Sequence, residues 1–145
     1  MDTKFIDIKD IPIGSKVGTA CVLIDGESGK FYLSKRLGKF ETNKYCCPGG
    51  MVEENEMCDE AISRELFEET GLQYPPNAFK YITVACHNGA KSDYTIWFKL
   101  SLNDGHELPK NIEPDKHEDW QLYTIDEANK LPLMLSTYDL INYKL

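Results

Sequence analysis

Three glutamates in the segment Arg64-Glu65-Leu66-Phe67-Glu68-Glu69 have the spacing of a divalent-cation site. A helical residue advances by about 100°, so Glu65, Glu68 and Glu69, at i, i+3 and i+4, share one helix face. Like charges at this spacing repel by roughly 0.2–0.5 kcal/mol per pair, and the dipole of a helix disfavours anions in its last turn. Mg²⁺ takes oxygen ligands and commonly bridges carboxylates to substrate phosphates. The segment therefore indicates either a metal site or a solvated acidic face.

A longer pattern surrounds these glutamates and favours the metal site. Residues 50–72, GMVEENEMCDEAISRELFEETGL, fit G-x5-E-x7-R-E-U-x-E-E-x-G-U, where U is aliphatic. From average residue usage, a chance match is on the order of one in 10⁹ per starting position. This pattern resembles the signature box of the Nudix (MutT-like) hydrolases, and the preceding Pro48-Gly49 is also similar to that family. Weaker similarity runs from about residue 17 to 132.

The resemblance implies both a fold and a set of roles. The fold would be α+β: a Nudix-type α/β/α sandwich with a mixed β-sheet and the box helix. The reaction would be hydrolysis of a nucleoside diphosphate linked to another group, with Mg²⁺ as cofactor, or Mn²⁺, which accepts the same oxygen ligands. Glu65 would be general base or orient the attacking water, Arg64 would hold it in place, and Glu56 would support that network. The implied metal ligands are the Gly50 carbonyl oxygen, Glu65, Glu68 and Glu69.

Further site residues are expected outside the box. Residues 113–120, EPDKHEDW, resemble the E-P-x-K-x-E-x-W stretch of Nudix enzymes that cleave nucleoside triphosphates. Glu118 is our predicted extra metal ligand, with Asp119 second, and a solvated acidic loop is the alternative. Arg36 and Lys44 occupy places where related enzymes bind phosphate, although each could be an ordinary surface cation. A guanidinium fork matches phosphate better than an ammonium group does, so we favour Arg36.

Aromatic side chains could stack on a nucleobase. Trp120 is our predicted substrate contact, and Trp97, Tyr94 and Phe40 are further candidates, although aromatic residues on strands more often belong to the core. The three histidines show no metal-ligand spacing, and we assign them no role: His87, His106 and His117.

The hydrophobic pattern predicts the elements that position these residues. The box helix should run from about Glu56 to Thr70, capped by Asn55 at its start and by Gly71 at its end. A polar turn is expected at Asn88-Gly89, a short helix over 126–131 and another over the last ten residues. Strands and helices do not alternate in βαβ order, which favours an α+β arrangement. The predicted strands are Val17–Ile24, Phe31–Arg36, Lys44–Cys47, Phe79–His87 and Tyr94–Leu102.

Composition limits the class of protein. The 145 residues, 41% of them hydrophobic, suit a single domain over 1–145. A net charge of −8 argues against binding extended nucleic acid, which needs basic residues. No apolar stretch has the length of a membrane helix, and residues 1–10 show no signal region, so we expect a cytoplasmic protein. Five cysteines without a CxxC pair suggest reduced thiols. The resemblance to the Nudix family, whose members are often dimers, also raises the possibility of a homodimer.

The expected reaction is hydrolysis of a nucleoside or deoxynucleoside triphosphate to the monophosphate and pyrophosphate. The alternative is an ADP-ribose or nucleotide-sugar pyrophosphatase, although ADP-ribose enzymes often carry a proline some sixteen residues after the box, where this chain has Asn88. An alternative of another class is a non-catalytic, nucleotide-binding Nudix module. Such a module would be expected to have lost a box carboxylate, and all are present.

Overall fold

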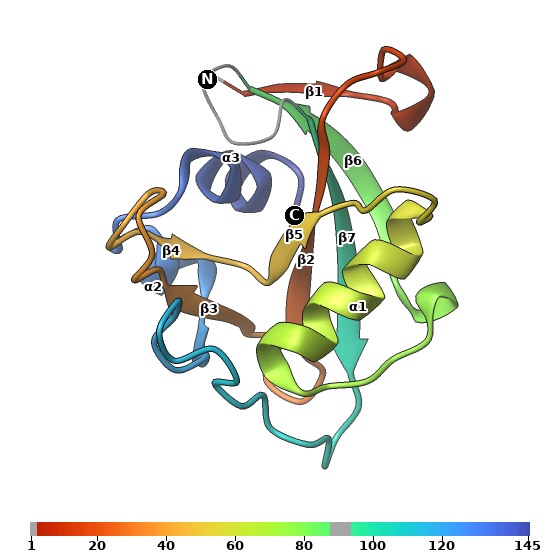
Figure 1. Ribbon diagram of the computed structural model, residues 1–145. Coiled ribbons are helices and arrows are strands. Elements are labelled where there is room, and N and C mark those ends of the chain that lie inside the picture. The colour runs from red at the N-terminus through yellow and green to blue at the C-terminus, as the bar shows by residue number, and fades with distance from the viewer. Residues whose placement is uncertain (1–2, 88–93) are drawn as a thin grey trace.

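The computed structural model describes residues 3–87 and 94–145. A twisted mixed sheet separates the 13-residue helix α1 (Cys58–Thr70) on one face from α3 (Leu135–Tyr143) on the other (Figure 1). Short helices fill the connections: η1 (Ile8–Asp10), η2 (Pro76–Ala78) and α2 (Ile125–Ala128). This is the predicted α/β/α sandwich with a mixed sheet. The predicted turn at Asn88-Gly89 lies outside the described residues.

The long strands β2 (Val17–Asp25) and β7 (Tyr94–Leu102) pair in parallel at the centre of the sheet. The remaining strands are β1 (Lys4–Ile6), β3 (Phe31–Lys35), β4 (Tyr45–Cys46), β5 (Gly49–Met51), β6 (Lys80–Cys86) and β8 (Gln121–Tyr123). Among these strands of the described residues, every other strand pairing is antiparallel. The strand order is β1-β6-β7-β2-β3-β4, with β5 paired to β2 and β8 paired to β3.

Both faces of the central strands are apolar, because each faces a helix. Successive side chains of a strand point to opposite faces, so β2 sends Cys21 and Leu23 toward α1 but Val22 toward α3. Ile62 and Leu66 of α1 complete the first core, and α3 supplies buried residues to the second. Burial of both faces explains why residues 17–24 (VGTACVLI) form a nearly continuous apolar run in the sequence.

The box helix begins at Cys58, two residues later than predicted, and Asn55 does not cap it. Asn55 instead adopts a left-handed conformation (φ 63°) in a turn in which the Glu56 carboxylate accepts a hydrogen bond from the Glu53 N–H at 2.9 Å. The first helical turn is closed by Glu60, which accepts from the Met57 N–H at 2.9 Å. The predicted end is confirmed, since Gly71 follows the helix with φ 77°.

The chain stays paired with the sheet through Gly49 and Gly50. After β4 it crosses to β2, where Gly49 pairs with Ala20 and Gly50 with Thr19. A side chain at Gly49 would collide with the Thr19 carbonyl oxygen, so glycine is required for this pairing. The crossing carries Gly49 and Gly50 beneath α1.

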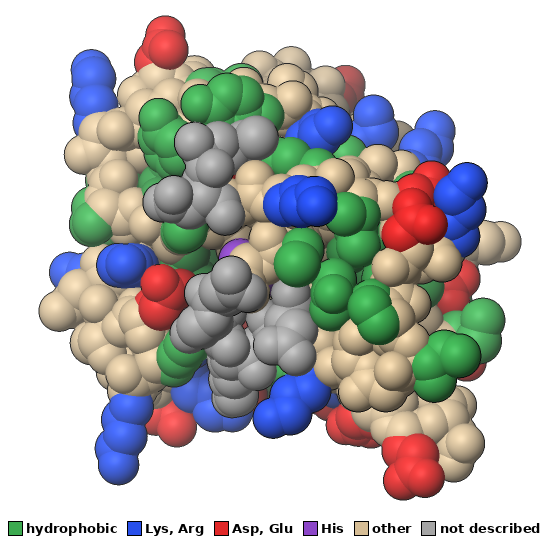
Figure 2. Space-filling model, turned by 90° about the horizontal axis from the view of Figure 1, so that it is seen from above, with side chains coloured by type: hydrophobic (Ala, Val, Ile, Leu, Met, Phe, Trp, Pro, Cys, Tyr) green, Lys and Arg blue, Asp and Glu red, His purple; other side chains and the backbone are tan. Residues whose placement is uncertain are grey.

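Some surface properties bear on function. None of the helices in the described part of the chain is long and apolar enough to span a bilayer. All five cysteines are free thiols, as predicted. On the face in Figure 2, Lys and Arg side chains are scattered among side chains of other types.

Candidate active site

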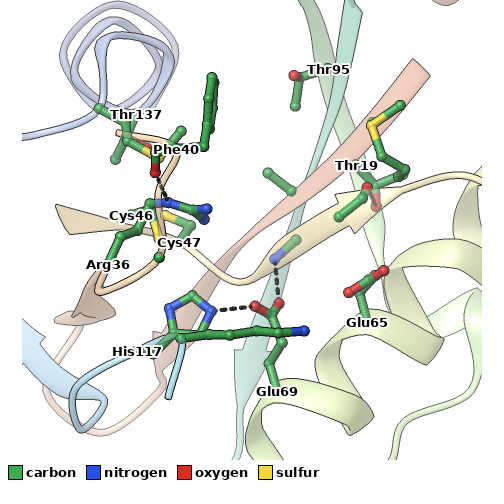
Figure 3. Close-up of a pocket in the computed structure, with 18 of the residues that line it drawn as sticks. Thr19, Arg36, Phe40, Cys46, Cys47, Glu65, Glu69, Thr95, His117 and Thr137 are labelled. Atoms are coloured by element: carbon green, nitrogen blue, oxygen red, sulfur yellow. Dashed lines mark hydrogen bonds and ion pairs between the residues drawn. The ribbon is translucent and has the colours of Figure 1, made fainter. Parts of the chain in front are cut away.

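A cavity of about 650 Å³ opens between α1, the β2–β5 pair, the loop before β8 and the start of α3. Small-molecule sites commonly have volumes of about 300–1,000 Å³. Glu65, Glu68 and Glu69 line it from α1. Opposite them lie Arg36, Phe40 and Thr137 (Figure 3). The cavity therefore has an acidic side and a side that carries a guanidinium and an aromatic ring.

Arg64 lies between Glu56 and Glu65 and contacts both. Its Nε and Nη2 donate to the two oxygens of Glu56 at 2.7 and 3.0 Å, and its Nη1 donates to Glu65 Oε1 at 2.9 Å. Nη2 also donates to the Met51 carbonyl oxygen at 3.0 Å. The hydrogen bonds from Arg64 hold the pKa of Glu56 below its usual value. This fork holds Glu65 against β5.

The Glu65 carboxyl lies directly against Gly50. A side chain at Gly50 would overlap that carboxyl group, so this glycine makes the space that Glu65 occupies. Burial raises the pKa of Glu65 to about 7, with a further upward contribution from the Glu69 charge, while Arg64 opposes both. A carboxyl group with a pKa near neutrality suits a general base.

Glu69 is the most enclosed of the three carboxylates, with 5% of its surface exposed. Its Oε1 accepts from the Gly49 N–H at 2.7 Å, and its Oε2 lies 2.9 Å from His117 Nε2. Its backbone carbonyl oxygen accepts from Trp120 Nε1 at 3.2 Å. Burial raises the pKa of this carboxyl, and the hydrogen bond from His117 opposes the rise. Glu68, by contrast, is half-exposed and lies 3.3 Å from Arg64.

The structure brings Arg36 to the cavity. Its Nε donates to the Phe40 carbonyl oxygen at 2.9 Å, and its guanidinium lies 5.8 Å from the centroid of the Phe40 ring. These two contacts orient the guanidinium across the cavity from Glu65 (Figure 3).

The predicted substrate contacts Lys44 and Trp120 and the predicted ligand Glu118 lie outside the cavity lining. Lys44 pairs with Glu41 at 3.4 Å. Trp120 is buried in the core beneath α1, with its ring 5.4 Å from that of His117. Glu118 lines a separate hollow with Asp119. The Glu118 backbone bonds to β3, through its N–H to Lys35 and its carbonyl oxygen to Ser34. The role of the Glu118 carboxylate as a metal ligand stays a prediction.

Sequence reasoning missed Glu113 and His117, which line the cavity. Their ligand atoms and one from Glu69 lie within 4.8 Å of one another. The sequence signal that could have identified them is the i, i+4 spacing of a carboxylate and an imidazole in EPDKH. In the structure these two residues lie in one turn, in which the His117 N–H donates to the Glu113 carbonyl oxygen at 3.1 Å.

Comparison with known proteins agrees with this geometry. The family model described as NUDIX domain matches residues 14–143, so the chain belongs to the NUDIX family. A MutT NUDIX hydrolase from Burkholderia pseudomallei has a similar structure, with a TM-score of 0.70 and 25% identity over 85% of this chain and 92% of that one. Family and site together identify the chain as a Nudix hydrolase, as the sequence predicted.

Two further structures are similar in fold. The NUDIX domain of Shewanella oneidensis NrtR, complexed with ADP ribose, has a TM-score of 0.73 and 17% identity, covering 94% of this chain and 89% of that one. A bifunctional NMN adenylyltransferase/ADP ribose pyrophosphatase from Francisella tularensis has a TM-score of 0.71 and 18% identity, covering 92% and 41%. A second structure of the Francisella enzyme contains AMP and a Mn ion.

Proposed function

We propose that this Nudix hydrolase cleaves a nucleoside or deoxynucleoside triphosphate to the monophosphate and pyrophosphate, with Mg²⁺ or Mn²⁺ as cofactor. The observation that carries the proposal is the polarity of the cavity. Carboxylates line one side, Arg36 and Lys116 supply positive charge, and Phe40 supplies apolar surface. A triphosphate needs metal ligands and cations at its phosphates and an apolar surface at its base.

The acidic side offers carboxylate oxygens to a divalent cation. In the described residues, the ligand atoms of Glu65, Glu68 and Glu69 do not all lie within 4.8 Å of one another, so these side chains would have to move together to share one ion. Burial and the neighbouring Glu69 charge raise the pKa of Glu65, and a bound cation relieves that repulsion. Glu65, Glu68, Glu69 and the Gly50 carbonyl oxygen would hold it, and all four donors are the hard oxygens that Mg²⁺ prefers. Such a cation would neutralise charge on the phosphate oxygens and lower the pKa of a bound water.

The protein's own groups then bind and orient the reactants. Arg36 would bind phosphate oxygens, because its guanidinium is already directed across the cavity. Glu65, held by Arg64 at 2.9 Å, would take a proton from the attacking water as the bond between the α- and β-phosphates breaks. Positioning supplies most of the catalysis in phosphoryl transfer, since little covalent chemistry is required of the protein.

The second candidate is an ADP-ribose or nucleotide-sugar pyrophosphatase. Its support is the likeness in fold to the Shewanella domain complexed with ADP ribose and to the Francisella pyrophosphatase. The same carboxylates would serve both reactions, because each breaks a phosphoanhydride bond.

One panel of substrates separates the candidates. The purified protein is incubated with Mg²⁺ or Mn²⁺ and, separately, with nucleoside triphosphates, deoxynucleoside triphosphates, ADP-ribose and nucleotide sugars. We expect monophosphate and pyrophosphate from triphosphates. Turnover of ADP-ribose or sugar nucleotides alone would replace the proposed substrate with the second candidate. An absence of turnover with metal bound would favour the non-catalytic nucleotide-binding module.

A further inference from the structure

A second set of potential metal ligands lies beside the box carboxylates. It comprises Glu69, Glu113 and His117, which are buried, half-buried and buried in that order. One ligand atom from each lies within 4.8 Å of the others. Ligands bound at about 2.0–2.2 Å to one ion lie at most about 4.4 Å apart. Three such ligands cannot all lie opposite one another and are at most about 3.8 Å apart, so movements of up to about 0.6 Å would bring all three atoms to a common ion.

Hydrogen bonds to and from the backbone hold these three residues in place. Glu113 and His117 belong to one turn, closed by the 3.1 Å hydrogen bond between their backbones, and His117 forms an isolated bridge to Arg36 next to β3. Asn111 Nδ2 donates to the His117 carbonyl oxygen at 2.8 Å. Glu69 is fixed by the Gly49 N–H at 2.7 Å.

The His117 imidazole is directed into this set. Its side chain is 5% exposed, and Nε2 lies 2.9 Å from Glu69 Oε2 (Figure 3). In the described part of the chain, its Nδ1 is buried without a hydrogen-bond partner, and so is Oδ1 of the adjoining Asn111. Metal-bound histidines characteristically donate their other ring N–H to an acceptor, and this amide oxygen is an acceptor on a side chain that already contacts His117.

The charge at this point also favours a cation. Glu69 is buried, and the Glu113 carboxylate lies beside it. The positive neighbour of Glu113 is Lys116, at 3.1 Å, whose side chain is 61% exposed. This ammonium group is exposed to water, which screens its charge, so it compensates the buried Glu69 only weakly.

The donor set has one nitrogen and two oxygens. Imidazole nitrogen suits transition metals, whereas Mg²⁺ and Ca²⁺ are selected by oxygen alone. We propose that Glu69, Glu113 and His117 bind a divalent transition-metal ion in preference to Mg²⁺. The inference rests on the proposed function in one respect, since Glu69 would be shared with the oxygen-only site of Glu65 and Glu68.

The test detects the nitrogen ligand directly. MnCl₂ is added to the intact protein without nucleotide, and pulsed electron paramagnetic resonance is used to detect ¹⁴N coupled to the bound Mn²⁺. We expect ¹⁴N coupling in the wild type, its loss in His117→Gln, and its persistence in His106→Gln, which removes a histidine remote from the cavity. Excess Mg²⁺ should displace Mn²⁺ that lacks the nitrogen signal but spare Mn²⁺ that shows it.

A second pair of variants tests the carboxylate in the loop. Glu113→Gln should weaken Mn²⁺ binding at least about tenfold, and Asp115→Asn, which neutralises an exposed carboxylate of the same loop, should leave it unchanged. Because the key signal is read in the wild type, a misfolded His117→Gln would not prevent the test.

The outcomes are distinct. Mn²⁺ bound without ¹⁴N coupling would overturn this inference and leave the proposed hydrolase intact, because the oxygen-only site would explain the binding. Loss of binding in Glu118→Gln but not in Glu113→Gln would also overturn it, in favour of Glu118. A protein that binds no Mn²⁺ and hydrolyses nothing would overturn both proposals.

Discussion

Replacing Gly50 by alanine tests whether the position of Glu65 controls catalysis. The new methyl group would overlap the Glu65 carboxyl group, whereas ordinary van der Waals contact begins at 3.4 Å. The Gly50 backbone does not have a positive φ, so alanine introduces no backbone strain. The flexible end of Glu65 must therefore move away, by roughly 1 Å, and no charge is added or removed.

A displacement of about 1 Å at a catalytic group can cost about 10²-fold in rate. At about 1.36 kcal/mol per tenfold, this corresponds to about 2.7 kcal/mol of lost transition-state stabilisation. Stability should change less, because the main structural loss is the hydrogen bond from Arg64 to Glu65. One such bond contributes about 1 kcal/mol, which lowers Tm by roughly 4 °C.

The assay is kcat/KM for pyrophosphate release from the best triphosphate, measured beside a thermal melt. Gly49→Ala is the matched control, since its new methyl group would meet the Thr19 backbone and not a side chain. We expect Gly49→Ala to lose mainly stability and Gly50→Ala mainly activity. A folded Gly50→Ala enzyme with near-native kcat/KM would refute the idea that this glycine positions Glu65.

Three further changes test other parts of the structure. Glu65→Gln should keep the fold but lower turnover by at least about 10²-fold, as for a lost base or metal ligand; near-native turnover in a steady-state assay would remove Glu65 from the mechanism. Trp120→Phe removes the 3.2 Å hydrogen bond to the Glu69 carbonyl oxygen and should cost about 1 kcal/mol in chemical denaturation, whereas an unchanged free energy of unfolding would mean that this bond contributes nothing. His106 bonds to the Glu107 carbonyl oxygen and to Asp25, and both contacts raise the pKa of His106. The protonated His106 therefore contributes its full stabilisation of the folded state below the unfolded pKa of about 6.5. This stabilisation is lost as the pH rises through the raised pKa of the folded state. At low pH the partner Asp25 decides the outcome, because hydrogen bonds from Ser28 and His106 lower the pKa of Asp25. The stabilisation by ionised Asp25 is complete above about pH 4 and is lost as the pH falls through the lowered pKa of Asp25. The Tm difference between wild type and His106→Asn should thus be largest between about pH 4 and 6.5, and a difference independent of pH would contradict this account.

Long elements with local signals could be predicted from the sequence. The central strand Val17–Asp25 is a buried apolar run, and Gly71 ends α1 in the left-handed conformation that glycine favours. The three-residue strands Lys4–Ile6 and Gln121–Tyr123 were missed, because their conformation depends on pairing with β6 and β3. Pairing with distant strands leaves no hydrophobic periodicity in such short segments of the sequence.

The same distinction applies to the site. Glu65, Glu68 and Glu69 could be placed together from helical periodicity alone, since they share one element. Glu113 and His117 reach the cavity only because their loop bridges to Arg36 beside β3, which spacing along the chain does not reveal. That bridge and the pairing of the Glu118 backbone with β3 fix the side of the loop on which each side chain lies.

Glu69 joins segments that are far apart along the chain. Its contacts with Gly49 and Trp120 span 20 and 51 residues. Closing such loops costs entropy before any contact repays it, and non-local contacts slow folding. We therefore expect the cavity to form late in folding, after the strands and the loop before β8 have docked. Activity regained during refolding should then follow the slowest structural phase, and no fragment lacking either segment should retain the site.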